Sequence, residues 1–435
     1  MSASGSAPLA IRGARLIDPA SGLDTRGDLL IQDGRIADLG PGVLAAGVPE
    51  GAVCVEAGGL ILAPGLVDMR VFVGEPGGEH RETLASASHA AAAGGVTTIV
   101  CMPNTDPPID GGALVDYLGR RAAETACVNV RVMAAITRGL KGRELTEMGL
   151  LADAGAVAFT DGDRAVADPR TMRMALTYAR MFDKLVVQHA IDPDLARDGA
   201  MNEGEVSTRL GLTGIPTQAE TIIVERDLRL LELAGGRYHV GELSCADAVA
   251  VVRAAKARGL AVTAGVATHH FALNENAVAE YRTFAKTMPP LRTEDDRRAV
   301  VAGIADGTID VIVSSHAPHD QEAKRQPFAQ AAWGVVGLET MLTIALELVH
   351  RGHADLHRVL GAMTCRPASL LGLDCGQLVR GAPGDLVLID LEAPWRVDAE
   401  KLASKSKNTP YDGRPVQGRA VLTVVRGRIV HDTRP

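Results

Sequence analysis

The sequence predicts an α/β protein: a (β/α)8 barrel with a small β-sandwich domain built from both ends of the chain. Two patterns lead to this prediction. Short apolar runs alternate with helical patterns throughout the middle of the chain, as a parallel barrel requires. Strand-rich segments with tight turns come before and after this middle part. We therefore expect a barrel at residues 60–375 and a sandwich formed by residues 1–59 and 376–435.

The terminal segments have the pattern of strands joined by short turns. Residues 10–17 and 28–37 are largely apolar, and Asp33-Gly34 between two apolar runs predicts a hairpin. Residues 385–390 and 418–430 repeat this pattern near the other end, with Arg426-Gly427 as the turn. Two such segments around a long α/β middle predict one sheet domain assembled from both termini.

The middle of the chain supplies the number of strands that a closed barrel needs. The predicted strands are residues 60–67, 97–102, 130–136, 156–159, 185–189, 237–240, 261–266 and 311–315. Helical patterns between them include residues 82–93, 168–182, 218–234 and 245–258. This alternation is typical of successive βα units.

Composition excludes several classes of protein. The 435 residues are 46% hydrophobic and 23% charged, which is typical of a globular protein with a large core. A net charge of -8 and only 3% aromatic residues argue against nucleic acid or an anionic membrane as partner. The six cysteines are scattered and form no C-x-x-C motif, so we expect reduced thiols and a cytoplasmic setting. No stretch approaches the length of a membrane span.

In such a barrel the working residues lie at the carboxyl ends of the strands. The first predicted strand runs into Asp68, and its alternation places Arg70 and Phe72 on one face. A guanidinium stays protonated and has no lone pair to give a metal, and a phenyl ring has none either. This strand end therefore cannot hold a metal ion through these two side chains.

Several short motifs at strand ends and in the loops that follow carry a resemblance to a known family. They are Glu75-Pro76-Gly77, Met102-Pro103-Asn104-Thr105, Asn202-Glu203-Gly204-Glu205, Pro289-Pro290-Leu291-Arg292, His316-Ala317-Pro318-His319 and Ser406-x-Asn408-Thr409-Pro410. In the order and the residues of these motifs, the chain resembles dihydroorotase of the class I bacterial type, in the amidohydrolase superfamily. The likeness covers nearly the whole chain and implies a TIM-type barrel and a place in pyrimidine biosynthesis.

The resemblance also implies a site, and much of it is missing. The family's His-x-His pair falls on Arg70 and Phe72, and its carboxylate-gripping arginine falls on Gly74. A further histidine falls on Glu242, a substrate-contacting asparagine falls on Met288, and the catalytic aspartate falls on Ser315. The acidic bridging position is retained as Asp161 and one ligand position as His189. We expect no catalytic residues at the degenerate positions.

The chemistry of these replacements predicts inactivity. The reaction needs a metal-bound water whose pKa falls from about 15.7 to roughly 7, and a carboxylate base beside it. Serine at position 315 is not a base at neutral pH, and the imidazole pair is absent. Loss of a general base alone costs a factor of about 10² to 10⁴ in rate. We expect no cofactor and no hydrolysis or closure of dihydroorotate at a physiological rate.

Two interpretations of the acidic and histidine residues that remain in the site are open. Asp161, His189 and Glu242 are able in principle to form a three-ligand site for one zinc ion. Alternatively Asp161 and His189 are polar core residues, hydrogen-bonded to each other or to Arg70. In that case Arg70 supplies the positive charge that Asp161 and Glu242 require without a metal. Asn104, His269 and His316 remain as candidate contacts in the old pocket.

The function implied by the resemblance is that of the inactive dihydroorotase-like proteins that partner aspartate carbamoyltransferase. We expect a non-catalytic structural subunit of that enzyme, present as a homodimer within a larger hetero-oligomer. Two other functions are alternatives: a working cyclic amidohydrolase with a reduced one-zinc site, and a ligand-sensing protein that uses the old pocket.

Overall fold

Eight parallel strands form a barrel whose neighbours follow the chain order. In the computed structural model, which describes residues 7–434, these strands are β6 (Leu66–Val71), β7 (Val96–Cys101), β8 (Asn129–Ala134), β9 (Ala158–Phe159), β10 (Leu185–Gln188), β13 (Arg237–Val240), β14 (Val262–Ala267) and β15 (Val311–Val313). The first and last strands meet just beyond their ends, where the Phe72 N–H donates to the His316 carbonyl over 2.9 Å. The predicted barrel is confirmed.

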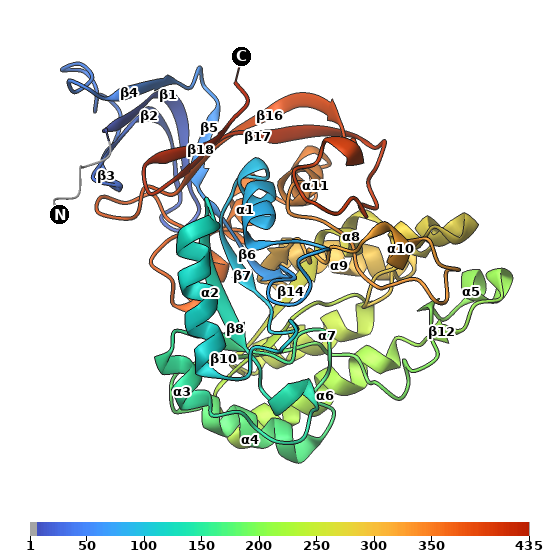
Figure 1. Ribbon diagram of the computed structural model, residues 1–435. Helices are drawn as coiled ribbons and strands as arrows, with labels where there is room; N and C mark the ends of the chain where they lie inside the picture. Colours follow the sequence, from blue (N-terminus) through green and yellow to red (C-terminus); the bar gives the residue numbers. More distant parts are fainter. Residues whose placement is uncertain (1–6, 435) are drawn as a thin grey trace.

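Helices connect the strands and cover the outside of the barrel (Figure 1). They are α1 (Leu84–Ala93), α2 (Gly112–Thr125), α3 (Met148–Asp153), α4 (Pro169–Arg180), α5 (Glu205–Leu210), α6 (Gln218–Ala234), α7 (Ala246–Ala257), α8 (Thr268–Ala272), α9 (Glu294–Asp306), α10 (Gln321–Lys324), α11 (Met341–His350), α12 (Leu356–Gly361) and α13 (Cys365–Leu371). Side chains fix several starts: Asp168 accepts from the Thr171 N–H, and Thr293 forms a capping box with Asp296. A short parallel pair, β11 (Met201–Asn202) and β12 (Gly214–Ile215), lies off the barrel.

The two ends of the chain meet in one mixed sheet, here called the terminal sheet. Its strands are β1 (Leu9–Asp18), β2 (Leu23–Gln32), β3 (Arg35–Gly40), β4 (Val53–Glu56), β5 (Ile61–Pro64), β16 (Leu386–Arg396), β17 (Pro415–Val425) and β18 (Arg428–Asp432). β5 joins the two halves by pairing parallel to β1 and antiparallel to β16. Strands from both ends also share one apolar core, so the predicted domain from both termini is confirmed.

Both predicted hairpin turns are present. Asp33 and Gly34 connect β2 to β3 with φ of 50° and 73°, and Arg426 and Gly427 connect β17 to β18 with φ of 49° and 75°. Two successive positive φ angles match the twist of the strands they join, which is why such turns favour glycine at the second position.

One predicted strand was wrong in its extent. Residues 60–67 form two strands rather than one: β5 belongs to the terminal sheet and β6 to the barrel, with Gly65 between them. A Cβ at Gly65 would lie 2.1 Å from the Thr97 hydroxyl oxygen, so there is no room for a side chain at this position. A continuous apolar run does not reveal this change of sheet, because both halves are buried.

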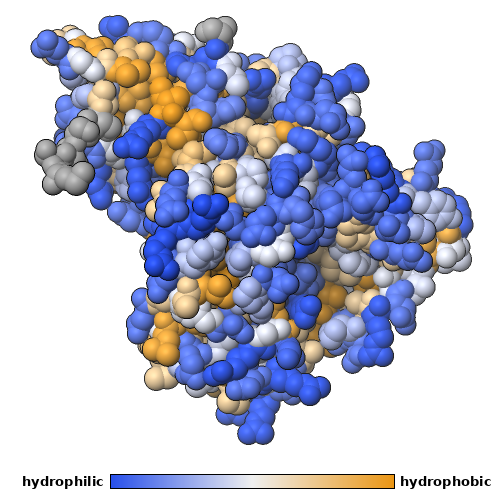
Figure 2. All heavy atoms as spheres, in the orientation of Figure 1, coloured by the Kyte–Doolittle hydropathy of each residue, from blue (hydrophilic) through white to orange (hydrophobic). Residues whose placement is uncertain are grey.

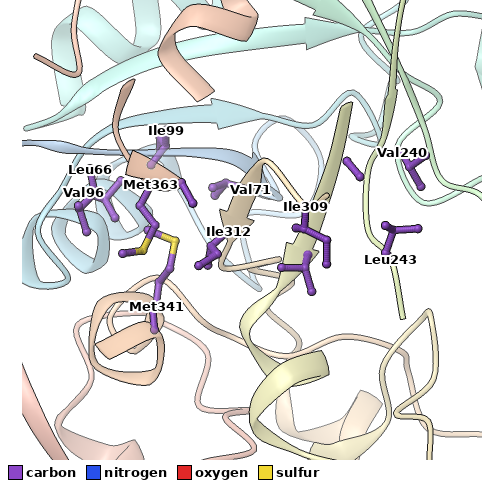
Figure 3. Close-up of a cluster of buried hydrophobic side chains, with 14 of the residues drawn as sticks. Leu66, Val71, Val96, Ile99, Val240, Leu243, Ile309, Ile312, Met341 and Met363 are labelled. Carbon is purple, nitrogen blue, oxygen red and sulfur yellow. The ribbon is translucent and has the colours of Figure 1, made fainter. Parts of the chain in front are cut away.

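The barrel strands separate two apolar layers. Along β7, Val100 belongs to a cluster with Met69 and Val187 inside the barrel, whereas its neighbour Ile99 belongs to the larger core between strands and helices. Figure 3 shows part of this larger core, with side chains from β6, β7 and the start of α11. On the molecular face in Figure 2, hydrophilic side chains predominate and apolar ones gather over the terminal sheet.

The terminal sheet is fastened to the barrel by direct contacts. α1 and α11 pack against β17, and the Thr423 hydroxyl donates to the Ala92 carbonyl over 2.7 Å. Asp385 makes the second connection: it accepts from the Asn129 side-chain amide at 2.8 Å and from the Arg426 N–H at 2.7 Å. Burial raises the pKa of Asp385, and these hydrogen bonds oppose the rise. The barrel and the sheet are thereby held as one packed structure.

We predict that Asp385→Ala lowers the free energy of unfolding by about 1–3 kcal/mol, because the buried Asn129 amide loses its acceptor. Chemical denaturation monitored by circular dichroism measures this change. Asp432→Ala is the control, because it removes a partly exposed ion pair and a backbone hydrogen bond with Arg434, the ion pair being worth about 0–1 kcal/mol. Equal effects of the two substitutions would contradict the assigned role of Asp385.

Candidate functional site

A cavity of about 490 Å³ opens at the carboxyl ends of the barrel strands and is here called the strand-end cavity. It collects predicted residues from distant parts of the chain: Arg70, Phe72, Asn104, His269, Met288, Ser315 and His316. The exposed residues Asp163 and Arg164 line it as well. The barrel topology therefore brings most of the predicted positions together.

Arg70 forms a buried ion pair with Glu242. Nε of Arg70 lies 2.9 Å from Oε2 of Glu242, and the two side chains are 11% and 1% exposed. The pairing is close but poorly aligned, since neither carboxylate oxygen receives a hydrogen bond of good geometry. Burial raises the pKa of Glu242, and the Arg70 charge opposes the rise. The predicted charge compensation is thus present for Glu242.

Asp161 is held by a different residue. It accepts hydrogen bonds from the Thr137 N–H at 2.9 Å and from the Thr137 hydroxyl. Burial raises the pKa of Asp161, while these hydrogen bonds oppose the rise. The expectation that Asp161 pairs with His189 or Arg70 was wrong, because both of its carboxylate oxygens accept from Thr137 on the neighbouring strand end.

His189 is buried and faces a second cavity that shares Met288 and Arg164 with the strand-end cavity. Its burial, together with the nearby Arg70 charge, lowers the pKa of His189 to about 3. The imidazole is therefore neutral at physiological pH. A metal ion at this position would also disfavour protonation of the imidazole, and the Arg70 charge has the same effect.

The residues at this position do not fit the metal that the resembled family implies. Among residues 7–434, no three His, Cys, Asp or Glu side chains come together in a group able to hold a metal ion. Asp161 is engaged by Thr137 and Glu242 by Arg70. A guanidinium therefore occupies the region where Asp161, His189 and Glu242 would have to converge, and no catalytic step is derived through a metal.

Phe72 supports a second arginine that the sequence analysis missed. The guanidinium carbon of Arg81 lies 4.7 Å from the centre of the Phe72 ring, which is a cation–π contact. Both residues line the strand-end cavity. Arg81 lies in a loop nine positions after Phe72, and no periodic pattern connects the two. Only the fold of this loop places Arg81 over the ring.

Gly74 has no room for the arginine that the resembled family carries there. Its φ is 75°, and a Cβ would lie 2.6 Å from the Gly78 carbonyl oxygen and 2.8 Å from that of Glu82. A side chain at this position would both strain the backbone and clash with it. Gly74 does not line the strand-end cavity, and the loop has closed over the place of the missing side chain.

His316 and the loop around it are held by polar contacts. Nε2 of His316 lies 3.4 Å from the Glu82 carboxylate, and its Nδ1 accepts from the Gly337 N–H at 3.3 Å. Burial disfavours the ionised carboxylate, but His316 and the hydroxyls of Ser404 and Ser86 together hold the pKa of Glu82 below its ordinary value. Asn408 accepts from the His319 N–H at 3.1 Å, which fixes the end of the same motif.

Ser315 and Asp68 show how the barrel closes beside the cavity. Ser315 adopts a positive φ of 51° and turns the chain out of β15. The preceding Ser314 donates its hydroxyl to Asp68, whose pKa burial raises to about 6. Asp68 therefore connects the first and last strands of the barrel. At position 315, where the resembled family has its base, this chain has the neutral hydroxyl of Ser315.

His269 and Asn104 carry polar atoms with no partner within the described chain. Nδ1 of His269 and Oδ1 of Asn104 are buried without a hydrogen bond among residues 7–434. Burial, with the Arg70 charge, lowers the pKa of His269 to about 3. The ring centre of His270 lies 4.4 Å from that of His269, and burial and His269 lower the pKa of His270 well below its ordinary value. Both imidazoles are neutral, and His269 lines the strand-end cavity.

Comparisons with known proteins agree with this fold. The family described as "Dihydro-orotase-like" matches residues 59–248, and the "Amidohydrolase family" matches residues 348–431. The dihydroorotase of Citrifermentans bemidjiense is 47% identical over 423 residues, covering 97% of this chain and 99% of its own. That of Anaplasma phagocytophilum is 47% identical over 424 residues, covering 96% and 94%.

Solved structures show the same architecture. L-hydantoinase (dihydropyrimidinase) from Arthrobacter aurescens superposes with a TM-score of 0.87 at 26% identity, covering 98% of this chain and 96% of its own. Dihydropyrimidinase from Brevibacillus agri has a TM-score of 0.85 at 21% identity, covering 98% and 95%, which concerns the fold alone. The fold is that of an amidohydrolase-type barrel. Within that class, the chain belongs to the dihydroorotase family.

Across residues 7–434, no helix has the length and apolar character needed to cross a membrane.

We predict that Arg70→Ala lowers the free energy of unfolding by about 3–5 kcal/mol, because it leaves Glu242 buried and unpaired. The double variant Arg70→Ala/Glu242→Gln is expected to recover part of this loss, since the remaining side chain is neutral. Denaturant unfolding of the wild type, both single variants and the double variant measures the coupling. Additive effects would show that Arg70 does not stabilise Glu242.

We predict that His269 contributes to acid sensitivity. Its pKa is about 3 in the folded protein and 6.5 in its ordinary state, so the unfolded chain binds a proton that the folded chain does not. Its contribution to stability is therefore complete above pH 6.5 and falls as the pH drops toward 3, by at most about 1.4 kcal/mol per pH unit. His269→Phe should flatten the fall in stability between pH 6.5 and 4, while the exposed-site control His80→Gln should not.

Proposed function

We propose that this member of the dihydroorotase family does not catalyse the dihydroorotase reaction and acts as a structural subunit for aspartate carbamoyltransferase. The observation that carries the first part is the Arg70–Glu242 ion pair at the centre of the site. A permanent cation there opposes the binding of a divalent metal, and the paired carboxylate is not available as a ligand.

The other requirements of the reaction point the same way. Activation of water needs a carboxylate near the reacting atoms, and Ser315 offers a hydroxyl in its place. The buried Asp68 carboxylate lies beside this strand end, but it accepts the hydroxyl of Ser314 where the barrel closes. His189 and His269 are kept neutral, so neither supplies a charge for an oxyanion. The curated relatives carry the name dihydroorotase, and this chain is 47% identical to one of them over 97% of its length.

The one-zinc alternative is less well supported by the geometry. It requires Asp161, His189 and Glu242 to turn toward a common point, which would break the bonds from Thr137 and the ion pair with Arg70. Each of these groups is buried, so the broken contacts would not be replaced by water. The structural role is supported by the intact fold: the barrel and terminal sheet remain fully packed although the catalytic set is absent.

We predict that the purified protein, after incubation with zinc and removal of the excess, contains far less than one metal per chain and gives no detectable turnover of L-dihydroorotate or N-carbamoyl-L-aspartate. Inductively coupled plasma mass spectrometry and an absorbance assay measure the two quantities. An active family member prepared in parallel is the positive control. About one tightly bound zinc per chain together with zinc-dependent turnover would overturn the proposed inactivity.

We predict that the protein forms a stable complex with the aspartate carbamoyltransferase of the same organism. The two purified proteins, alone and mixed, are compared by size-exclusion chromatography with light scattering. A common peak of larger mass than either component supports the structural role and gives the stoichiometry, including any homodimer. Separate elution at micromolar concentrations, with unchanged transcarbamoylase activity, would refute the partnership but would leave the inactivity result standing.

A further inference from the structure

β18 is an edge strand of the terminal sheet. It lies at one end of the strand order and pairs with β17 alone among residues 7–434. Within the same range, no backbone N–H or carbonyl of residues 428–432 bonds to the backbone of any other segment. A bulge also leaves Val430 opposite no residue of β17. The outer edge of β18 therefore presents backbone donors and acceptors to which a further strand is able to pair.

A cavity of about 800 Å³ follows this edge and is here called the edge groove. Arg428, Ile429 and Val430 line it on the side of the sheet. Successive strand residues point to opposite faces, so a cavity that contacts both Arg428 and Ile429 lies along the edge rather than over one face. α2, which lies below β18 in Figure 1, forms the opposite wall with small residues that include Gly119 and Ala123.

A second cavity continues along the strand and is here called the continuation groove. It has a volume of about 620 Å³ and is lined on the side of the sheet edge by Val430, His431 and Thr433. The two cavities therefore meet at Val430, the bulged residue. Six residues of extended chain, the length of segment 428–433, span about 20 Å. The two grooves together follow the edge over this length.

The edge groove carries an excess of positive charge. Arg131, Arg426 and Arg428 line it, are exposed, and form no ion pair within the described chain. Asp33 lines the same groove, and Asp385 lines an adjacent cavity together with Arg131 and Arg426. Three guanidinium groups against these two carboxylates leave one cation in excess.

The continuation groove has the same balance. Its cations are Arg396, Lys401 and Arg419, and its carboxylates are those of Glu339 and Asp398. Asp432, on β18 itself, adds no free negative charge because Arg434 pairs with it at 2.7 Å. The edge of β18 is thus bordered by net positive charge in a chain whose overall charge is -8. Such a local excess attracts negatively charged partners.

We propose that the free edge of β18 docks an extended, acidic segment of a partner protein, which adds a strand to the terminal sheet. Backbone pairing supplies affinity in this mode of recognition, and the grooves beside the edge select the side chains. A second copy of this chain fits less well, because its β18 would bring another α2 into the groove that α2 already borders. The assignment rests on the proposed structural function and deepens it, because it identifies the surface that holds the partner.

Two peptides that differ only in charge test the proposal. One has six residues of alternating valine and glutamate, the other alternating valine and lysine, and both carry the same neutral fluorophore. Fluorescence anisotropy with the full chain measures their affinities. We expect the glutamate peptide to bind saturably, with a Kd below about 1 mM, and the lysine peptide to bind at least about tenfold more weakly. Equal affinities, or no saturation by the glutamate peptide at about 1 mM, would overturn the proposal.

Methylation of the peptide backbone tests the pairing itself. In an extended strand, the N–H groups of alternate residues point to opposite edges, and an added strand uses only one of these sets. N-methylation of one alternate set of the glutamate peptide should therefore abolish binding, and methylation of the other set should be tolerated. Unchanged affinity of both methylated peptides would show that the peptide does not pair with β18.

Variants of the protein assign the contact to the edge groove. The double variant Arg426→Glu/Arg428→Glu should weaken binding of the glutamate peptide about tenfold and favour the lysine peptide instead. The control Arg173→Glu/Arg209→Glu changes the net charge equally at exposed positions of α4 and α5 and should leave the preference unchanged. Equal effects of the two double variants would overturn the assignment. The melting temperature of each free variant reports whether it is folded.

A steric variant tests the groove without altering its charge. Ala123→Leu adds a larger side chain to the α2 wall, and we expect it to weaken binding of the glutamate peptide. Wild-type affinity in this variant would place the peptide elsewhere. Light scattering of the protein alone reports on a second copy as the occupant. Self-association of the wild type that Ala123→Leu abolishes would show that a second copy uses the edge, and would overturn the proposal.

The partner test is separable from the test of the proposed function. Size-exclusion chromatography compares mixtures of aspartate carbamoyltransferase with the wild type and with Arg426→Glu/Arg428→Glu. Loss of the complex in the variant alone would support docking at this edge, and an unchanged complex would overturn it. If the wild type also fails to form a complex, the proposed partnership with the transcarbamoylase is refuted, while the peptide measurements still decide whether the edge binds an acidic strand.

Discussion

The ion pair between Arg70 and Glu242 is the interaction on which the rest of the site depends. A buried carboxylate next to buried imidazoles is unfavourable unless a positive charge lies close to it. Arg70 provides that charge at 2.9 Å, and the same charge helps to keep His189 and His269 neutral. One substituted residue therefore stabilises the remaining polar groups in a form that does not require a metal, and it also prevents them from converging on one.

The other substitutions are consistent with this arrangement. Phe72 supplies a ring face, and Arg81 stacks on it. The loop around Gly74 closes tightly enough that a side chain at this position would meet the Gly78 carbonyl. Phe72 and Arg81 both line the strand-end cavity, whose volume of about 490 Å³ is that of a small-molecule site.

The frame that surrounds the site does not rely on the missing residues. Barrel closure uses Asp68 and Ser314, the loop after β15 uses Glu82 and Asn408, and Asp385 connects the barrel to the terminal sheet. None of these contacts involves a position at which the family's ligands are replaced. The frame is therefore stabilised by contacts that lie outside the Arg70–Glu242 ion pair.

The sequence by itself determined the barrel and the terminal domain from both chain ends. Those features follow from strand periodicity, turn residues and side-chain chemistry, which act over a few neighbouring residues. Only the tertiary structure decided which charges pair. Asp161 bonds to Thr137 rather than to Arg70, residues 60–67 divide between two sheets, and Arg81 lies over Phe72. Each of these outcomes depends on distances between segments that are separate in sequence, and local pattern carries no information about such distances.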